Sequence, residues 1–301
     1  MRRPLSFVLA VLAGLAAAPN LTGQPAAKPL KIFISADMEG IAGVVQPAQL
    51  GPTGFEYGKA REWMTGEVKA AIAAAKGAGA AEFVVADSHG NAQNLLIDDL
   101  PPDVRVVRGF PRPLSMMQGI AAGFDAVLFV GYHASEYGRD AVRGHTFSSA
   151  RLLHVKLNGM EVSEGIYNAA IAGHFGVPVA FVSGDREAVA QLKGVIPTIE
   201  GVVLKEGLGY HAAETVTPTR SREMITKGVE AALKKIGTLQ PYRVKTPIDL
   251  DVGFKLTLDA ERASYIPGLT RADAHSVRGT FPDIVQIARL MQVLTSLEPP
   301  P

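Results

Sequence analysis

Short, continuous apolar runs alternate with longer amphipathic segments from Lys31 onward, and this alternation constrains the fold more than any other feature. Strands buried on both faces of a parallel sheet have continuous apolar runs, whereas helices repeat apolar residues at helical spacing. We expect strands at residues 31–37, 81–88, 104–109, 125–132 and 177–185, and helices at 57–78, 114–122, 163–175 and 187–193. The sequence therefore predicts an α/β fold with a mostly parallel central sheet flanked by helices.

Two later features depart from this alternation. Residues 151–157 form an extended run that leads into Asn158-Gly159, a strong signal for a β-hairpin turn. Beyond residue 199, helices expected at 221–236 and 282–297 enclose a segment of alternating character. We therefore expect a metal-binding α/β domain at 30–198 and a smaller C-terminal α+β domain at 199–301.

The first residues have the composition of a secretory signal peptide. Arg2 and Arg3 precede an apolar stretch from Leu5 to Leu15, and three alanines follow that suit cleavage. An uncleaved anchor is disfavoured because the stretch is shorter than the roughly 20 residues that span a bilayer. We expect a signal peptide at 1–18 and a disordered leader at 19–29, hence an exported protein, periplasmic or secreted, without stable membrane insertion.

Net charge and cysteine content exclude some kinds of partner and some kinds of active site. Loss of Arg2 and Arg3 with the leader would leave 28 basic against 29 acidic side chains, a formal charge near −1. A nearly neutral chain argues against nucleic acid as a partner. The chain has no cysteine, which excludes disulfides, thiolate zinc sites and cysteine nucleophiles. Any bound metal must be held by His, Asp and Glu.

Acidic and imidazole side chains follow three of the predicted strands. Asp37 and Glu39 end the first strand, His89 follows the second, and His133 follows the fourth. In open α/β sheets, ligands bind beyond the carboxyl ends of the strands. Carboxylates and imidazoles at such positions are the side chains that bind zinc when sulfur is absent. Asp37 and Glu39 could instead cap a helix near Gly40, although the glycines and prolines that follow argue against that helix, and His89 and His133, each taken alone, could be ordinary turn histidines.

The spacing of the first pair favours a metal over these alternatives. Side chains alternate along an extended segment, so Asp37 and Glu39 point to one side and Met38 points to the other. Two such carboxylates would repel each other in a poorly solvated crevice unless a cation lay between them. A pair of divalent ions about 3.5–4 Å apart would resolve the repulsion.

Three further residues are ambiguous from their local sequence. Asp87 is more typical of an outer carboxylate or a turn residue than of a ligand. His145 lies in a glycine-flanked loop from which it could reach a substrate, or be an ordinary loop histidine. Glu164 opens a predicted helix, where a carboxylate often only complements the helix dipole. Nucleotide-binding glycine motifs and the serine-hydrolase elbow are absent from the sequence.

Several motifs, taken together, resemble the zinc D-aminopeptidases named for a bacterial dipeptide-transport operon. They are "SADMEGIAG", "ADSHGNAQNLL", "RPLSMMQG", "FVGYHA", "NGMEVSEGIYNAAIAGHFGVPVAFVSGD" and "YIPGLTRADAHSVRGTF". The resemblance runs from about residue 31 to residue 297, and its specificity comes from the order and spacing of the whole set.

The resemblance implies a site and an activity. Two zinc ions per subunit would be held by Asp37, Glu39, His89, His133 and Glu164, with His145 as the catalytic residue. The family pattern implies a homo-oligomer, a decamer with enclosed active sites, that hydrolyses short peptides beginning with a D-amino acid, such as D-Ala-D-Ala. The predicted leader departs from cytoplasmic relatives and suggests peptides derived from the cell wall.

Two other functions remain compatible with the sequence. One is a related exported metallohydrolase that acts on L-peptides or other amides. The other is a non-catalytic protein that binds peptides or metal, against which stands the presence of His145 beside five candidate ligands. The sequence does not decide whether His145 is a nucleophile or an acid–base group.

Overall fold

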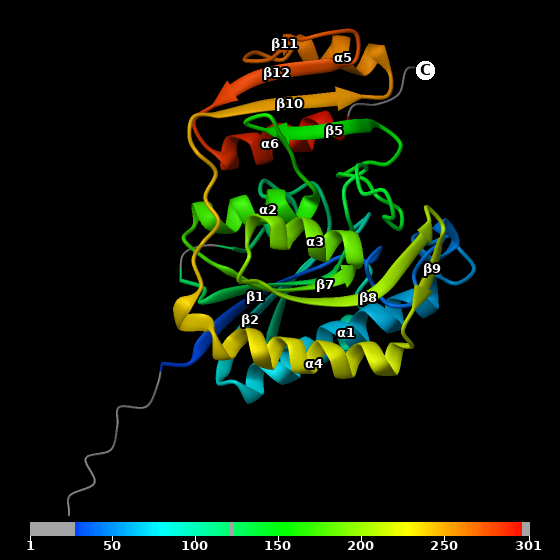
Figure 1. Ribbon diagram of the computed structural model, residues 1–301, viewed down its shortest axis with the longest axis vertical. Helices are drawn as coiled ribbons and strands as arrows, with labels where there is room; N and C mark the ends of the chain where they lie inside the picture. The colour runs from blue at the N-terminus through cyan, green and yellow to red at the C-terminus, as the bar shows by residue number, and fades with distance from the viewer. Residues whose placement is uncertain (1–27, 121–122, 297–301) are drawn as a thin grey trace, which may run out of the picture.

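A seven-stranded sheet runs through the centre of the computed structural model, which describes residues 28–120 and 123–296 (Figure 1). The predicted signal peptide, 1–18, and residues 19–27 of the predicted leader lie outside the described residues. The strands of this sheet are β1 (Leu30–Ala36), β2 (Ala80–Asp87), β3 (Val104–Val107), β4 (Ala126–Tyr132), β7 (Val179–Asp185), β8 (Glu200–Gly209) and β9 (Ala212–Thr215). The predicted α/β class with a mostly parallel sheet is confirmed.

The strand order, β3-β2-β1-β4-β7-β8-β9, reverses direction at β1. All neighbours in the sheet are parallel except β8 and β9, which pair antiparallel. Ala36 at the end of β1 pairs with Asp87 of β2 on one side and with Val130 of β4 on the other. The three carboxyl ends are therefore level at the switch point, where the connections that leave β1 and β4 go to opposite faces of the sheet and a crevice forms between them.

Helices cover both faces of this sheet (Figure 1). The helices are α1 (Tyr57–Gly77), α2 (Glu164–His174), α3 (Arg186–Val195), α4 (Pro218–Lys234), α5 (Thr257–Ser264) and α6 (Ile284–Leu294). Helices α1 and α4 pack together on one face, and α2 and α3 lie on the other. In α1 the buried Met64, Val68, Ala71, Ile72 and Ala75 recur at helical spacing, so the helix turns one apolar stripe to the sheet.

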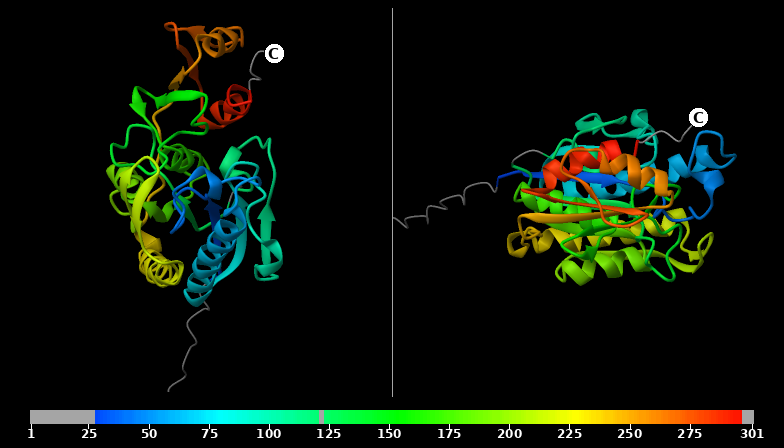
Figure 2. Two further views of the ribbon diagram at one scale, coloured as in Figure 1. Left: turned by 90° about the vertical axis from the view of Figure 1, so that its right-hand side faces the viewer. Right: turned by 90° about the horizontal axis from the view of Figure 1, so that it is seen from above.

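A second, antiparallel sheet lies beyond α2 and α3, as the two further views show (Figure 2). Its order is β11-β12-β10-β5-β6, with β5 (Leu152–Leu157), β6 (Met160–Glu161), β10 (Ile248–Phe254), β11 (Thr270–Arg271) and β12 (Ser276–Phe281). Helices α5 and α6 pack against it, and α6 also contacts α2. The predicted hairpin turn joins β5 to β6, with positive φ angles at Asn158 and Gly159.

Alternate residues of the central strands pack into two different apolar cores. Phe33, Val127 and Phe129 belong to the core beneath α2, α3 and the second sheet, whereas Ile34 and Leu128 belong to the core beneath α1 and α4. Continuous apolar runs are therefore needed because both faces of each strand are buried.

The segment that follows β3 differs from the sequence-based expectation. Over 114–120 the expected helix is replaced by a short 3-10 turn, Ser115–Met117, and the last two residues of the expected helix, 121 and 122, lie outside the described residues. Gly119 then takes a φ of +103° and lies so close to Val84 and Val107 that a Cβ there would be 3.1 Å from each side chain. Tertiary packing, and not a regular helix, therefore determines the backbone conformation of this segment.

The predicted division at residues 198 and 199 does not coincide with the division between the sheets. Strands β5 and β6, before this boundary, belong to the second sheet, while β8 and β9, after it, extend the large sheet. The chain therefore crosses between the two sheets more than once.

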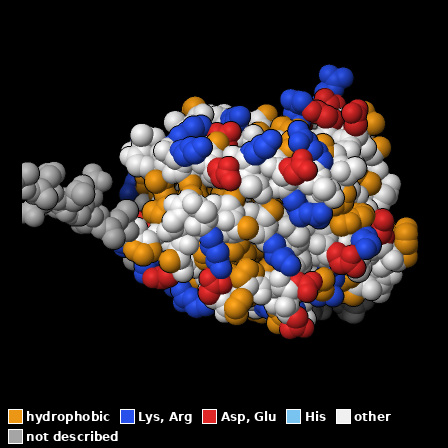
Figure 3. All heavy atoms as spheres, turned by 90° about the horizontal axis from the view of Figure 1, so that it is seen from below, with side chains coloured by type: hydrophobic (Ala, Val, Ile, Leu, Met, Phe, Trp, Pro, Cys, Tyr) orange, Lys and Arg blue, Asp and Glu red, His pale blue; other side chains and the backbone are white. Residues whose placement is uncertain are grey.

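The face covered by α1 and α4 has Lys and Arg side chains interspersed with Asp and Glu (Figure 3). Within this region, pairs such as Lys59 with Glu62 and Arg220 with Glu223 join opposite charges. Among the described helices, none combines the length and the apolar character that a membrane span requires.

The close approach of the β1 and β4 ends yields a test at Gly40. A Cβ at this position would collide with backbone atoms of Gly131 and Tyr132, which cannot move as a flexible side chain can. We expect Gly40→Ala to lower the free energy of unfolding by about 1–3 kcal/mol in urea titrations. Gly51→Ala is the control, since a methyl group there would meet no atom within 4 Å; equal stability of the two variants would contradict the packing argument.

Candidate metal centre

Asp37 and Glu39 are held in place by hydrogen bonds between the end of β1 and β4. The backbone N–H of Asp37 donates to Val130 O at 2.9 Å, and that of Gly40 donates to Gly131 O at 2.7 Å. Both carboxylates are buried, with exposed fractions of 2% and 4%. Met38 is fully buried in the core beneath α1 and α4, as the alternation of side chains predicts.

Two histidines approach Asp37 from neighbouring strand ends. His89 follows β2, and its Nδ1 lies 2.7 Å from Glu39 Oε2 and 3.5 Å from Asp37 Oδ1. His133 follows β4, and its Nε2 lies 3.3 Å from Asp37 Oδ2. Asp37 therefore lies between two imidazoles, with one carboxylate oxygen directed at each.

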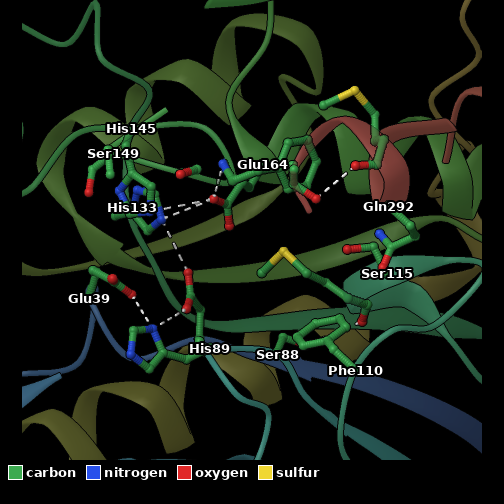
Figure 4. Close-up of a pocket in the computed structure, with 18 of the residues that line it drawn as sticks. Glu39, Ser88, His89, Phe110, Ser115, His133, His145, Ser149, Glu164 and Gln292 are labelled. Carbon is green, nitrogen blue, oxygen red and sulfur yellow. Dashed lines mark hydrogen bonds and ion pairs between the residues drawn. The ribbon is translucent and has the colours of Figure 1, made fainter. Parts of the chain in front are cut away.

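Glu164 and His145 complete the cluster from segments outside the central strands. Glu164 is the first residue of α2, whose preceding Ser163 caps the helix. Its Oε1 lies 3.6 Å from His133 Nε2 and 3.8 Å from His145 Nε2. The rings of His133 and His145 stack with centroids 4.1 Å apart. The structure thus brings together all six residues that the sequence nominated, of which Figure 4 labels all but Asp37, and their individual roles stay predictions.

Each of the three histidines binds a backbone carbonyl through its other ring nitrogen. His89 Nε2 lies 2.8 Å from Leu50 O, His133 Nδ1 2.8 Å from Ala134 O, and His145 Nδ1 2.8 Å from a carbonyl in its own loop. A ring nitrogen that donates to a carbonyl leaves the opposite nitrogen with a free lone pair. This orientation is typical of histidines that bind metals.

In this cluster, the pKa values of the carboxylates and of the imidazoles depend on each other's charge. Burial, followed by the charge of Glu39, raises the pKa of Asp37 to about 7. Burial alone would raise the pKa of Glu39, but the adjacent His89 holds it well below its usual value. Burial would likewise lower the pKa of His133, yet the Glu164 carboxylate raises it well above the usual value. Protons here partly balance the charge that a cation would balance.

The donor atoms fit a bound metal. Two groups of ligand atoms each lie within 4.8 Å of one another: Asp37, Glu39 and His133 in one, and His133, His145 and Glu164 in the other. Asp37 Oδ2 and His133 Nε2 are buried and have no hydrogen-bond partner. Buried polar atoms without partners are costly, and a cation between them would satisfy both. Oxygen and imidazole ligands of this kind suit zinc.

The cluster forms one wall of a cavity of about 740 Å³. Glu39, His89, His133, His145 and Glu164 point toward one another on one side, whereas Phe110, Ser115 and Gln292 lie on the opposite side (Figure 4). The cavity therefore lies between the candidate ligands and a wall built from the segment after β3 and from α6.

Lys205 on β8 is a supporting residue that sequence analysis missed. It is 1% exposed, and its Nζ donates to the carbonyls of Glu39 and Val44. Burial lowers the pKa of its ammonium group to about 8. Lys205 thus fixes both ends of the turn that carries Glu39. The only sequence signal was a lysine inside an apolar strand.

Asp87 has the turn role that its sequence context favoured. Its carboxylate accepts hydrogen bonds from the backbone N–H groups of Asn94 and Leu95, at 2.6 and 2.8 Å. The carboxylate therefore braces the loop that carries His89.

A family model described as D-aminopeptidase, peptidase family M55, matches residues 30–293 of the chain. The chain belongs to the D-aminopeptidase family. It is therefore a peptidase by family, and all six nominated residues fall inside the matched region. The resemblance that the motifs indicated is confirmed.

Relatives of this D-aminopeptidase family member agree with the assignment. A D-aminopeptidase from Bacillus subtilis (strain 168) is 29% identical over 272 residues, which cover 89% of this chain and 97% of the relative. The solved structure of the Zn-dependent D-aminopeptidase DppA from Bacillus subtilis, described as a self-compartmentalizing protease, superposes with a TM-score of 0.85. It is 28% identical and covers 89% of this chain and 97% of that structure's chain.

Proposed function

We propose that this protein is a dinuclear zinc aminopeptidase that releases the N-terminal D-amino acid from short peptides such as D-Ala-D-Ala. One observation carries the proposal: Asp37 lies between His89 and His133, and its Oδ2 and His133 Nε2 are buried without hydrogen-bond partners in a ligand group that shares His133 with a second group. The zinc dependence of the related DppA supports the choice of metal.

Five residues would hold the metals: Asp37, Glu39, His89, His133 and Glu164. Three carboxylates against two divalent ions leave a net positive site. Such a site polarises the scissile carbonyl and activates water when the metals are bound. Asp37 would contribute through both of its oxygens, because they face different imidazoles.

His145 is placed to exchange a proton with the substrate. Its Nδ1 donates to a carbonyl, so Nε2 has a free lone pair at the cavity wall. Burial, together with the neighbouring His133, lowers the pKa of His145. The imidazole is therefore neutral near pH 7, able to accept a proton from the attacking group and return it to the leaving amine.

Export and assembly are further parts of the proposal. The leader at 1–18 supports an exported, periplasmic or secreted enzyme acting on cell-wall-derived peptides. The description of DppA as self-compartmentalizing supports a homo-oligomer, for which we propose a decamer. Native mass spectrometry of the exported protein tests both, because subunit mass reports leader removal and complex mass reports subunit number.

Turnover of matched stereoisomers tests the activity. Zinc-loaded protein is expected to release D-alanine from D-Ala-D-Ala faster than it hydrolyses L-Ala-L-Ala, and to stop when a chelator removes the metal. His145→Ala should lower kcat by about 10²–10⁴-fold, because a positioned acid–base group contributes that much. His174→Ala, at the exposed end of α2, is the control. Equal rates with and without metal would refute the proposal.

Zinc affinity is expected to rise with pH. The pKa values of His89 and His133 lie above the usual value, and that of Asp37 is about 7, so protons occupy ligand atoms below neutrality. Each displaced proton should strengthen binding by about tenfold per pH unit while the group remains protonated. Competition with a chromophoric chelator between pH 6 and pH 8 measures this slope. A flat profile would show that these groups are not the ligands.

A further inference from the structure

Arg143 lines the cavity two residues before His145, in the loop between β4 and β5. Its carbonyl accepts the hydrogen bond from His145 Nδ1 at 2.8 Å, and its N–H donates to Tyr210 O at 2.9 Å. Its φ of +57° is unusual for a residue with a side chain. Such strain persists where surrounding contacts impose it, often at ligand-binding sites.

The guanidinium group of Arg143 has no acidic partner. No carboxylate of the described residues lies within ion-pair distance of it, and its buried Nε has no hydrogen-bond partner. The ring of Tyr210 lies beneath it, 5.6 Å from the guanidinium carbon to the ring centroid. Among the described cavity-lining residues, Arg143 is the single Lys or Arg. A half-buried cation thus faces the cavity without a counter-charge.

The three cavity-lining carboxylates are already committed to the imidazole cluster. Asp37, Glu39 and Glu164 each lie within 4 Å of at least one histidine nitrogen. Arg143 therefore offers the substrate a second polar contact in the cavity. This contact is positively charged and does not belong to the imidazole cluster. A planar guanidinium pairs best with a carboxylate, which it can bind through two parallel hydrogen bonds.

We propose that Arg143 binds the C-terminal carboxylate of the peptide substrate and so selects short peptides with a free carboxyl terminus. This rests on the proposed aminopeptidase function. Arg143 lines the same cavity as His145 and the candidate ligands. A dipeptide or tripeptide held at the metal ligands would therefore place its free carboxylate in the cavity that the guanidinium faces.

A matched pair of substrates isolates this contact: D-Ala-Gly and D-Ala-Gly amide, which differ only in the terminal charge. Zinc-loaded wild-type protein is expected to prefer the acid. Arg143→Gln should lower kcat/KM for the acid by about 10–100-fold, mainly through KM, because a charge-assisted contact is lost. The acid-to-amide ratio should then approach one. Arg143→Lys, which keeps the charge but not the fork, should restore part of the preference.

Arg139→Gln is the control variant, since Arg139 is an exposed residue of the same loop and does not line the cavity. It removes the same charge and should leave the acid-to-amide ratio unchanged. A ratio that falls equally in both variants would show a general field effect. An equal loss of kcat/KM for the acid and the amide in Arg143→Gln would show that Arg143 acts structurally, through its contact with Tyr210. Either result would overturn the proposal.

Binding measurements separate this inference from the proposed function. Calorimetric titration of chelator-treated protein with the same two peptides requires no turnover. Tighter binding of the acid in wild type, lost in Arg143→Gln, would support the carboxylate contact even if zinc-loaded protein hydrolysed neither peptide. Absence of turnover alone would contradict the aminopeptidase proposal. Equal binding of acid and amide by wild type would contradict the role of Arg143.

Discussion

The structure depends on one electrostatic constraint, the burial of Asp37 between two imidazoles. Its carboxylate is 2% exposed, with His89 on one side, His133 on the other, and Glu39 and Glu164 in the same cluster. Burying several like charges is unfavourable unless cations or protons balance them. The raised pKa values of the imidazoles and of Asp37 express that imbalance. Metal ions would balance the same charges without taking up protons.

The sheet topology explains how residues far apart in sequence meet at this point. The strand register brings the ends of β1, β2 and β4 to the same edge of the sheet, so each strand places candidate ligands among the residues that follow it. Backbone hydrogen bonds join the β1 turn to β4, and Lys205 holds that turn from β8. These supports act on backbone atoms of the turn that carries Asp37 and Glu39, and so hold that turn against β4 and β8. Preorganisation of this kind is what metal sites and catalytic groups require.

Sequence reasoning found the parts of the site that local patterns encode. Apolar runs locate the central strands, and the acids and histidines that end them locate Asp37, Glu39, His89 and His133. Glu164 and His145 come from a helix start and a loop, where local sequence favours ordinary roles, and only the family motifs selected them. Arg143 and Lys205 were missed because their environment comes from β8 and its hairpin. The sheet crossings of β5 and β8 were missed for the same reason, since pairing over long separations leaves no periodic signal.

The proposed function requires that the buried cluster hold two metal ions, with Asp37 as a ligand of both. Anomalous X-ray diffraction at the zinc edge, from crystals of zinc-loaded protein, tests it most directly. The account predicts two peaks about 3.5–4 Å apart, within bonding distance of Asp37, Glu39, His89, His133 and Glu164, with Asp37 touching both. A single peak, or peaks bound by other residues, would contradict it.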